Sequence, residues 1–181
     1  PRNVLERLPK LRLISNTGHY MAHLDLEAAA DLGITVCETT RLPGPTGAVA
    51  ELTFTLMLAL ARNLLAEDRS VRAGGWQAGI GTQLGGRRLG VLGLGRSGAP
   101  VAKLGLAFEM DVVAWSQNLT EARCAELGVR YVDKETLFRS SDFISVQLVL
   151  SKRTRGLVGA AEFALMKPTA YLINTARGPI I

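Results

Sequence analysis

The fold is decided by residues 88–98, Arg88-Leu89-Gly90-Val91-Leu92-Gly93-Leu94-Gly95-Arg96-Ser97-Gly98. The apolar start of this stretch predicts a buried strand, and the residues after it, to about Phe108, predict a helix. Glycines between a strand and a helix let the backbone approach a pyrophosphate, which the amides and dipole of the helix N-terminus attract. A glycine-rich turn alone is weak evidence, but this context favours a dinucleotide site built from Gly93, Gly95, Arg96, Ser97 and Gly98.

Strand-like and helix-like segments alternate along the rest of the chain. Before the glycine loop, a strand, a helix and a strand are predicted at Leu11–Ser15, Leu24–Leu32 and Ile34–Cys37. After it, the predicted strands are Val112–Trp115, Val129–Val132, Phe143–Val146 and Tyr171–Asn174, with helices at Glu121–Leu127, Glu135–Phe138 and Ala160–Leu165. The alternation predicts the α/β class and a Rossmann-type, doubly wound parallel sheet.

Prolines and glycines in Arg41–Gly47 indicate a linker, which predicts one domain at residues 1–45 and a second at residues 46–181. The apolar run Ala48–Ala66 approaches the length of a membrane span, but Glu51, Arg62 and Asn63 interrupt it, which favours a core or interdomain helix. No segment after Tyr171–Asn174 completes the second sheet. We therefore expect a fragment whose second domain is incomplete at its C-terminal end.

Composition and charge argue against several classes of function. The 181 residues are 48% hydrophobic and 20% charged, as expected for a globular chain, and the net charge of +5 comes from scattered basic residues. This scatter argues against a nucleic-acid partner. Cys37 and Cys124 have no metal-ligand spacing, so neither a metal site nor a disulfide framework is expected. No leader pattern follows Pro1, so we expect a cytoplasmic protein.

The residue about 20 positions beyond the glycine loop bears on the choice of cofactor. An Asp or Glu at this place would bind the ribose hydroxyls of NAD, but the sequence has Ser116. Asp111 lies at the wrong end of the predicted strand and is interpreted as a solvated turn residue. Without a carboxylate a 2′-phosphate is not repelled, yet no Arg follows Ser116 closely. NAD is therefore the expected cofactor, with NADP not excluded.

Four segments in order carry a specific resemblance. They are Asp25-Leu26-Glu27-Ala28-Ala29 with Gly33-Ile34, Ala48-Val49-Ala50-Glu51 opening the long helix, the glycine loop, and Asn174-Thr175-Ala176-Arg177-Gly178. In these segments the chain resembles the D-isomer-specific 2-hydroxyacid dehydrogenases, which include phosphoglycerate, formate and glycerate dehydrogenases. The resemblance implies a cofactor domain inserted into a flavodoxin-like substrate domain, of which residues 1–45 are a fragment, so the chain would be truncated at both ends.

The resemblance also implies residue roles. Arg177 would be the catalytic arginine that clamps the substrate carboxylate and polarises the C2 oxygen. Thr175 and Ala176 would lie near the nicotinamide. Thr17 and Gly18 would belong to the loop that holds the carboxylate. The general acid of the family is a later histidine, expected beyond Ile181, so His19 and His23 are interpreted as ordinary residues.

The chain departs from the family pattern at Gln147-Leu148-Val149, where members of the family frequently have His-Val-Pro. Leu148 can still contact the cofactor. The implied reaction is hydride transfer between NAD(P) and the C2 of a D-2-hydroxy or 2-keto acid, and a phosphoglycerate dehydrogenase-like enzyme is one form of it. The alternative is a dinucleotide-sensing binding protein or corepressor of the same fold without turnover. The long apolar helix would serve a homodimer, as in the family.

Overall fold

The computed structural model describes residues 1–17, 21, 24–38 and 47–181 and divides the chain into two compact units, Pro1–Gly44 and Pro45–Ile181. The first unit contains α1 (Arg2–Leu5), β1 (Leu13–Asn16), α2 (Leu26–Asp31) and β2 (Thr35–Glu38). β1 pairs in parallel with β2. The Asp25 carboxylate caps α2 by accepting a hydrogen bond from the Ala28 amide at 2.8 Å. The predicted strand, helix and strand are all present.

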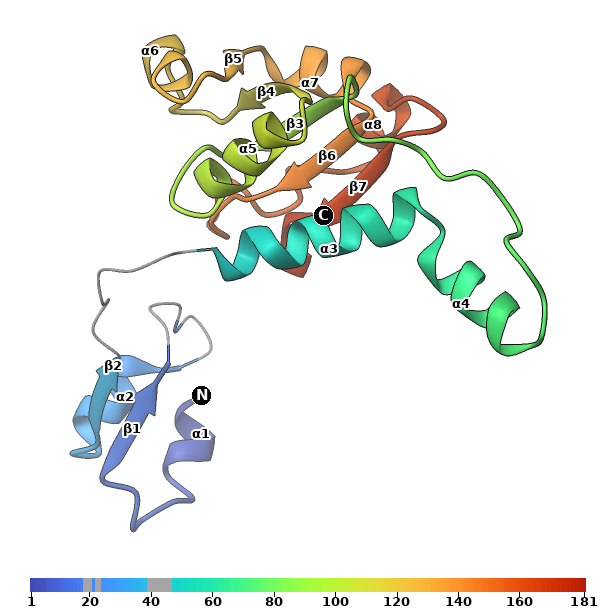
Figure 1. Ribbon diagram of the computed structural model, residues 1–181. Coiled ribbons are helices and arrows are strands. Elements are labelled where there is room, and N and C mark those ends of the chain that lie inside the picture. The colour runs from blue at the N-terminus through green and yellow to red at the C-terminus, as the bar shows by residue number, and fades with distance from the viewer. Residues whose placement is uncertain (18–20, 22–23, 39–46) are drawn as a thin grey trace. The chain divides into compact units, whose positions relative to one another are not determined.

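The second unit is built on a parallel sheet of five strands in the order β5-β4-β3-β6-β7 (Figure 1). The strands are β3 (Arg88–Leu92), β4 (Asp111–Trp115), β5 (Arg130–Tyr131), β6 (Phe143–Val146) and β7 (Tyr171–Asn174). The chain proceeds outward from β3 to β5 and then returns to place β6 on the other side of β3. This reversal is the topological switch point at which open α/β sheets bind ligands.

Helices cover both faces of this sheet, as the doubly wound prediction requires. On one face, α3 (Ala48–Ala61) and α5 (Gly98–Ala107) pack over Leu89 and Val91 of β3. On the other face, α7 (Lys134–Ser140) packs over Leu92 of β3. The side chains of a strand alternate between faces, so the apolar run of β3 is buried on both sides. The remaining helices are α6 (Glu121–Ala125), α8 (Ala160–Leu165) and the 3-10 turn η1 (Gly178–Ile180).

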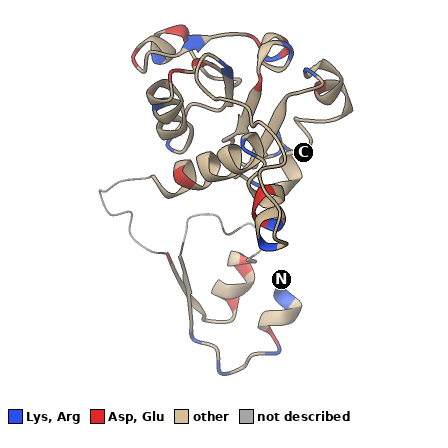
Figure 2. Cartoon of the chain, turned by 45° about the vertical axis from the view of Figure 1, so that its right-hand side comes forward, with Lys and Arg blue, Asp and Glu red and all other residues tan. Residues whose placement is uncertain are grey.

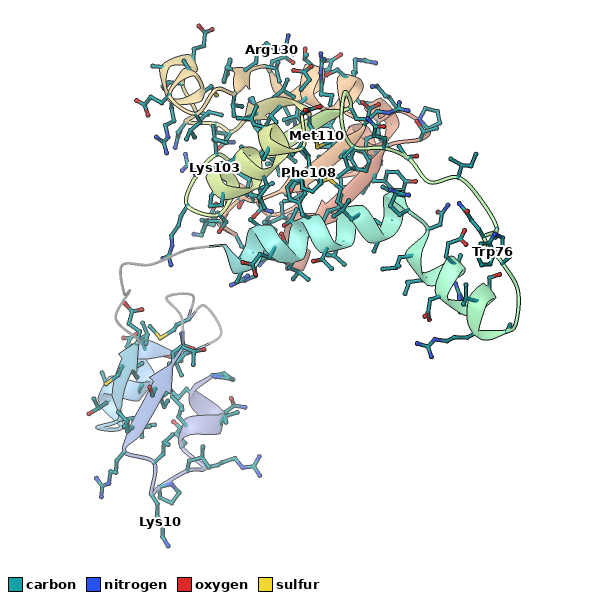
Figure 3. The ribbon with its side chains drawn as sticks, viewed as in Figure 1. Lys10, Trp76, Lys103, Phe108, Met110 and Arg130 are labelled. Atoms are coloured by element: carbon teal, nitrogen blue, oxygen red, sulfur yellow. The ribbon has the colours of Figure 1, made fainter. Side chains whose placement is uncertain are left out.

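The aromatic contact between α3 and the end of α5 joins the long helix to the sheet. The rings of Phe54 and Phe108 stack with their centroids 5.2 Å apart, and Met110 is buried in the same cluster (Figure 3). The buried face of α3 therefore faces the second unit's own core.

The apolar run Ala48–Ala66 is not one helix. α3 ends at Ala61, Asn63 adopts a left-handed conformation with φ of 52°, and α4 (Leu64–Arg72) continues at an angle of 61° to α3. α4 has no buried residue and extends away from the sheet (Figure 1). In the described part of the chain no single helix is long and apolar enough to span a membrane, although α3 and α4 together pass that test of length and composition.

Asp111 is not the solvated turn residue that the sequence suggested. It begins β4 and forms ion pairs with Arg88 of β3 at 2.7 Å and with Arg130 of β5 at 2.5 Å. Burial raises the pKa of its carboxyl group, but the hydrogen bonds and charges of the two arginines outweigh this and lower the pKa overall. The carboxylate thus links three adjacent strands at the edge of the sheet where they begin.

Candidate dinucleotide site

Four loops meet where the parallel strands end. The Gly93 amide, directly after β3, donates to the carbonyl oxygen of Trp115 at the end of β4 at 2.8 Å. The Gln147 amide, directly after β6, donates to the carbonyl oxygen of Leu92 at 2.8 Å. β7 lies beside β6, so the loop beginning at Thr175 is next in the row. These hydrogen bonds place the glycine loop at the centre of the carboxyl edge.

Two glycines of the loop, Gly93 and Gly98, lie in close contact with neighbouring backbone. Gly93 has φ of +97°, and a Cβ there would lie 3.0 Å from the Gln147 carbonyl oxygen. A Cβ on Gly98 would overlap the Gly93 carbonyl oxygen. A side chain at Gly98 would push the first turn of α5 away from the end of β3, and a side chain at Gly93 would collide with the loop after β6.

The side of the loop that faces away from the sheet is open and rich in amide donors. A Cβ on Gly95 would meet no atom within 4 Å. In the part of the chain that the structure describes, the amides of Arg96, Ser97 and Gly98 donate no hydrogen bond to protein. Unpaired amides at the start of a ten-residue helix attract a pyrophosphate. These residues therefore fit the phosphate-binding part of NAD.

Ser116 lies in a cavity of about 280 Å³ between the loops that follow β4 and β6. The cavity is lined by Trp115, Ser116, Gln117, Asn118, Leu148, Val149, Ser151, Arg153, Thr154 and Leu157. Leu148, predicted to contact the cofactor, forms part of this wall and also packs on the core. Arg96 is exposed and does not line the cavity. A cavity next to the glycine loop at this end of β4 is the place for the adenosine half of a dinucleotide.

The loop after β7 is held by its own hydrogen bonds. The Asn174 side chain accepts from the Ala176 amide and donates to the Arg177 carbonyl oxygen, both at 3.0 Å. The Arg177 guanidinium is exposed, and its Nη1 donates to the Ala176 carbonyl oxygen at 2.8 Å. Asn174 therefore fixes the path of the backbone that carries Arg177.

A polar cluster, formed by the buried Thr53, Ser145 and Gln147 and the half-buried Thr175, was not identified from the sequence as a unit. The Gln147 side-chain amide donates to Ser145 at 2.9 Å and to Thr175 at 2.8 Å, and its nitrogen lies 3.2 Å from the Thr53 hydroxyl. The hydroxyls of Thr53 and Thr175 are 2.8 Å apart. The available signal was Ser145 and Gln147, two polar residues spaced by two at the end of the apolar run that forms β6.

The predicted site residues belong to two separate units of the chain. Gly93, Gly95, Ser97, Gly98, Ser116, Leu148, Thr175, Ala176 and Arg177 all follow strands of the second unit at its carboxyl edge. Thr17 is exposed directly after β1 in the first unit. Gly18, His19 and His23 lie outside the described residues. The carboxylate-binding role of Thr17 and Gly18 therefore stays a prediction.

The fold and the glycine loop together define a dinucleotide-binding domain of the doubly wound class. The family described as D-isomer specific 2-hydroxyacid dehydrogenase, NAD binding domain, matches residues 54–181. The chain belongs to this family, and the matched residues are its NAD-binding domain. This confirms the family predicted from the four sequence segments and the Rossmann-type sheet.

Relatives of known name agree with this assignment. A glyoxylate reductase of Thermococcus litoralis is 38% identical over 190 residues, and one of Aeropyrum pernix is 40% identical over 189 residues; each alignment covers 99% of this chain and 56% of the relative. The crystal structure of a phosphoglycerate oxidoreductase from Vibrio cholerae superimposes with a TM-score of 0.93 at 35% identity, over 100% of this chain and 58% of that one.

A structure that contains a cofactor is also similar. The D-lactate dehydrogenase of Aquifex aeolicus, complexed with NAD and lactic acid, superimposes with a TM-score of 0.80 at 32% identity, over 100% of this chain and 54% of that one. The chain thus spans a little more than half the length of the relatives that it matches.

Proposed function

We propose that the protein containing this chain is an oxidoreductase that transfers a hydride between a nicotinamide dinucleotide and the C2 of a D-2-hydroxy or 2-keto acid. The observation that carries the proposal is the arrangement at the carboxyl edge of the sheet. There the Gly93–Gly98 loop lies at the switch point between β3 and β6, and Arg177 follows the neighbouring strand β7.

The residues of this chain would bind and orient both reactants. The amides at the start of α5 would hold the pyrophosphate, Leu148 would cover the adenosine side, and Thr175 with Ala176 would contact the nicotinamide end. A bound nicotinamide supplies or accepts the hydride, which is chemistry that no side chain provides. The contribution of the fold is to hold the reacting carbon atoms close together and aligned.

Arg177 would hold the substrate. Its guanidinium can form two parallel hydrogen bonds to a carboxylate, which fixes the direction of the C2 carbon, and a further N–H can reach the C2 oxygen. Charge that develops on this oxygen during hydride transfer to a keto acid would be stabilised by the cation. Thr17 and Gly18 are proposed to hold the other side of the carboxylate.

The exposed face of α3 and α4 supports a homodimer as the assembled state. Leu52, Leu56 and Leu60 are 52%, 40% and 45% exposed and recur every four residues along α3, so they form one apolar stripe. Glu51 is the one charged residue of α3, and the ribbon of this helix is otherwise tan in Figure 2. An apolar helix face of this kind is typical of subunit interfaces.

The deciding experiment uses full-length protein. Binding of NADH and NADPH is measured by fluorescence. Turnover is then measured with glyoxylate, hydroxypyruvate and phosphohydroxypyruvate. The first two are small 2-keto acids, and the third adds a phosphate group. The proposal predicts dinucleotide binding and oxidation of the reduced cofactor with at least one of these acids. Binding without turnover of any 2-keto acid would contradict the enzyme and would support a sensing protein.

A further inference from the structure

The cavity around Ser116 contains a cation and no carboxylate. No acidic residue is among its lining residues, although an Asp or Glu at the end of β4 would be expected in a site for NAD. Arg153, from the loop after β6, lines the same cavity as Ser116, Gln117 and Asn118. The sequence places Arg153 far from Ser116, and only the pairing of β6 beside β3 brings their loops together.

The loop that carries Arg153 is held by local hydrogen bonds. The Thr154 hydroxyl donates to the Val149 carbonyl oxygen at 2.6 Å and accepts from the Ser151 amide at 2.8 Å. The Arg155 amide donates to the Ser151 carbonyl oxygen at 3.0 Å. Binding a ligand here would therefore order little additional backbone, which lowers the entropic cost of binding.

The Arg153 guanidinium has no ion-pair partner among the described residues. An arginine that lines a cavity together with hydroxyl and amide side chains is suited to a phosphate group because its planar N–H donors match the phosphate oxygens. Ser116, Gln117 and Asn118 add a hydroxyl and two amides, which can donate to the same oxygens.

We propose that this cavity binds the 2′-phosphate of NADPH, with Arg153 as the specificity-determining cation and Ser116 as the position that admits the phosphate. The inference rests on the proposed function, because it places the adenosine ribose against the end of β4. It deepens that function by predicting that the protein prefers NADPH to NADH.

The test is the dissociation constant of each reduced cofactor for full-length protein, measured by calorimetry without substrate. Wild-type protein is expected to bind NADPH about tenfold more tightly than NADH, the ratio that one charge-assisted hydrogen bond supplies. The Arg153→Ala variant should weaken NADPH about tenfold and change NADH less than twofold. Arg155→Ala is the matched control, because Arg155 is a neighbouring exposed arginine that does not line the cavity.

A second variant reverses the preference. Ser116→Asp places a carboxylate where it repels the phosphate and accepts the ribose hydroxyls, so NADPH should weaken at least tenfold while NADH binds equally or more tightly. Retained NADH binding shows that this variant is folded.

The outcomes separate the inference from the function on which it rests. Wild-type protein that binds NADH at least as tightly as NADPH overturns the inference and leaves the dehydrogenase proposal intact. An equal loss of NADPH binding in Arg153→Ala and Arg155→Ala would show a general charge effect, which also overturns it. Failure to bind either cofactor would overturn the proposed function itself.

Discussion

Arg177 combines a fixed backbone with an exposed cation. Asn174 holds the turn that carries it, and η1 follows immediately, with the Val158 amide donating to the Ile180 carbonyl oxygen at 3.0 Å. The guanidinium is therefore presented from a stable loop at the edge of the sheet where ligands bind. This is the placement that substrate binding through a carboxylate requires.

The Arg177→Met variant should lower kcat/KM for a 2-keto acid about 100-fold to 1000-fold, the usual effect of removing one group that stabilises charge in the transition state. NADH binding should change less than twofold, because the side chain is proposed to touch the substrate and not the cofactor. Steady-state kinetics and a cofactor titration measure the two effects. A loss confined to NADH affinity would contradict the proposed role.

At the level of single residues, the sequence predicted positions that follow directly from one strand, and it missed contacts between residues that are far apart in the chain. The glycines and Ser116 follow their strands directly, so their positions could be predicted from the strand pattern alone. Arg153 could not be connected with Ser116 because their proximity depends on strand order, which the sequence does not state. Asp111 was misinterpreted for the same reason, since its two arginine partners lie on the neighbouring strands β3 and β5.

Among the elements, α3, β6 and the start of the loop after β7 are joined by the polar cluster of Thr53, Ser145, Gln147 and Thr175. The Gln147 side-chain amide donates to the Thr175 hydroxyl. The Thr53 hydroxyl donates to the Val49 carbonyl oxygen at 2.8 Å, which ties the cluster to the backbone of α3. Since Thr175 begins the loop that carries Arg177, the cluster connects the long helix to the proposed substrate arginine.

The Gln147→Leu variant should destabilise the protein by about 1–3 kcal/mol, because the hydroxyls that it served stay buried. It should also raise the KM for the keto acid more than it weakens NADH, since the loop after β7 loses an anchor. Urea unfolding and kinetics measure these effects. Thr53→Val is the companion variant, and in the double variant the losses should be less than additive. Strict additivity would show that the two residues do not act together.

The strands β3, β4 and β6 were predicted well because each contains an apolar run that is buried on both faces of the sheet. The end of α3 was not predicted, because Leu64 and Leu65 extend the apolar run past the left-handed turn at Asn63. α1 was also missed. It has four residues and no capping side-chain hydrogen bond, so no start signal marks it.

For the whole molecule, the proposed homodimer would form through the apolar stripe on α3. Leu60→Glu should convert a dimer to monomers, since an unpaired charge in an apolar interface is costly. Phe163→Glu on α8 is the control, because Phe163 is exposed to nearly the same extent, 46% against 45%, and lies on another helix. Analytical ultracentrifugation distinguishes the states. A Leu60→Glu protein with wild-type mass would contradict the interface.

Residues 64–81, which form α4 and the segment after it, follow α3 in the chain and expose further apolar side chains. The Glu67 carboxylate accepts from the amides of Ala78 and Gly79 at 3.0 and 3.1 Å, which folds the segment back along α4. Trp76, labelled beside α4 in Figure 3, and Ile80 are 84% and 95% exposed. These large exposed apolar side chains would add apolar area to the proposed dimer interface.

Low pH should destabilise the second unit, because it protonates a paired carboxylate at the edge of the sheet where the strands begin. Burial raises the pKa of the Asp142 carboxyl group, but the Arg88 amide and the Lys167 ammonium, at 2.8 Å each, outweigh it and hold the pKa below its usual range. A lowered folded-state pKa gives stability that is complete above the unfolded pKa and is lost as pH falls through the folded one. Unfolding free energies between pH 6 and pH 2.5 should therefore fall less steeply in Asp142→Asn. An identical slope would contradict this contribution.

The central claim is that the Gly93–Gly98 loop holds a dinucleotide, and a variant of Gly95 tests it most directly. A side chain at Gly95 meets no protein atom within 4 Å, so Gly95→Val should fold normally while filling the space that the pyrophosphate would occupy. The measurement is the titration of full-length wild-type and Gly95→Val protein with NADH and NADPH, with melting temperatures recorded alongside. We predict unchanged melting temperatures and at least tenfold weaker binding of both cofactors by the variant. Equal binding by the two proteins, or no binding by wild-type protein, would contradict the claim.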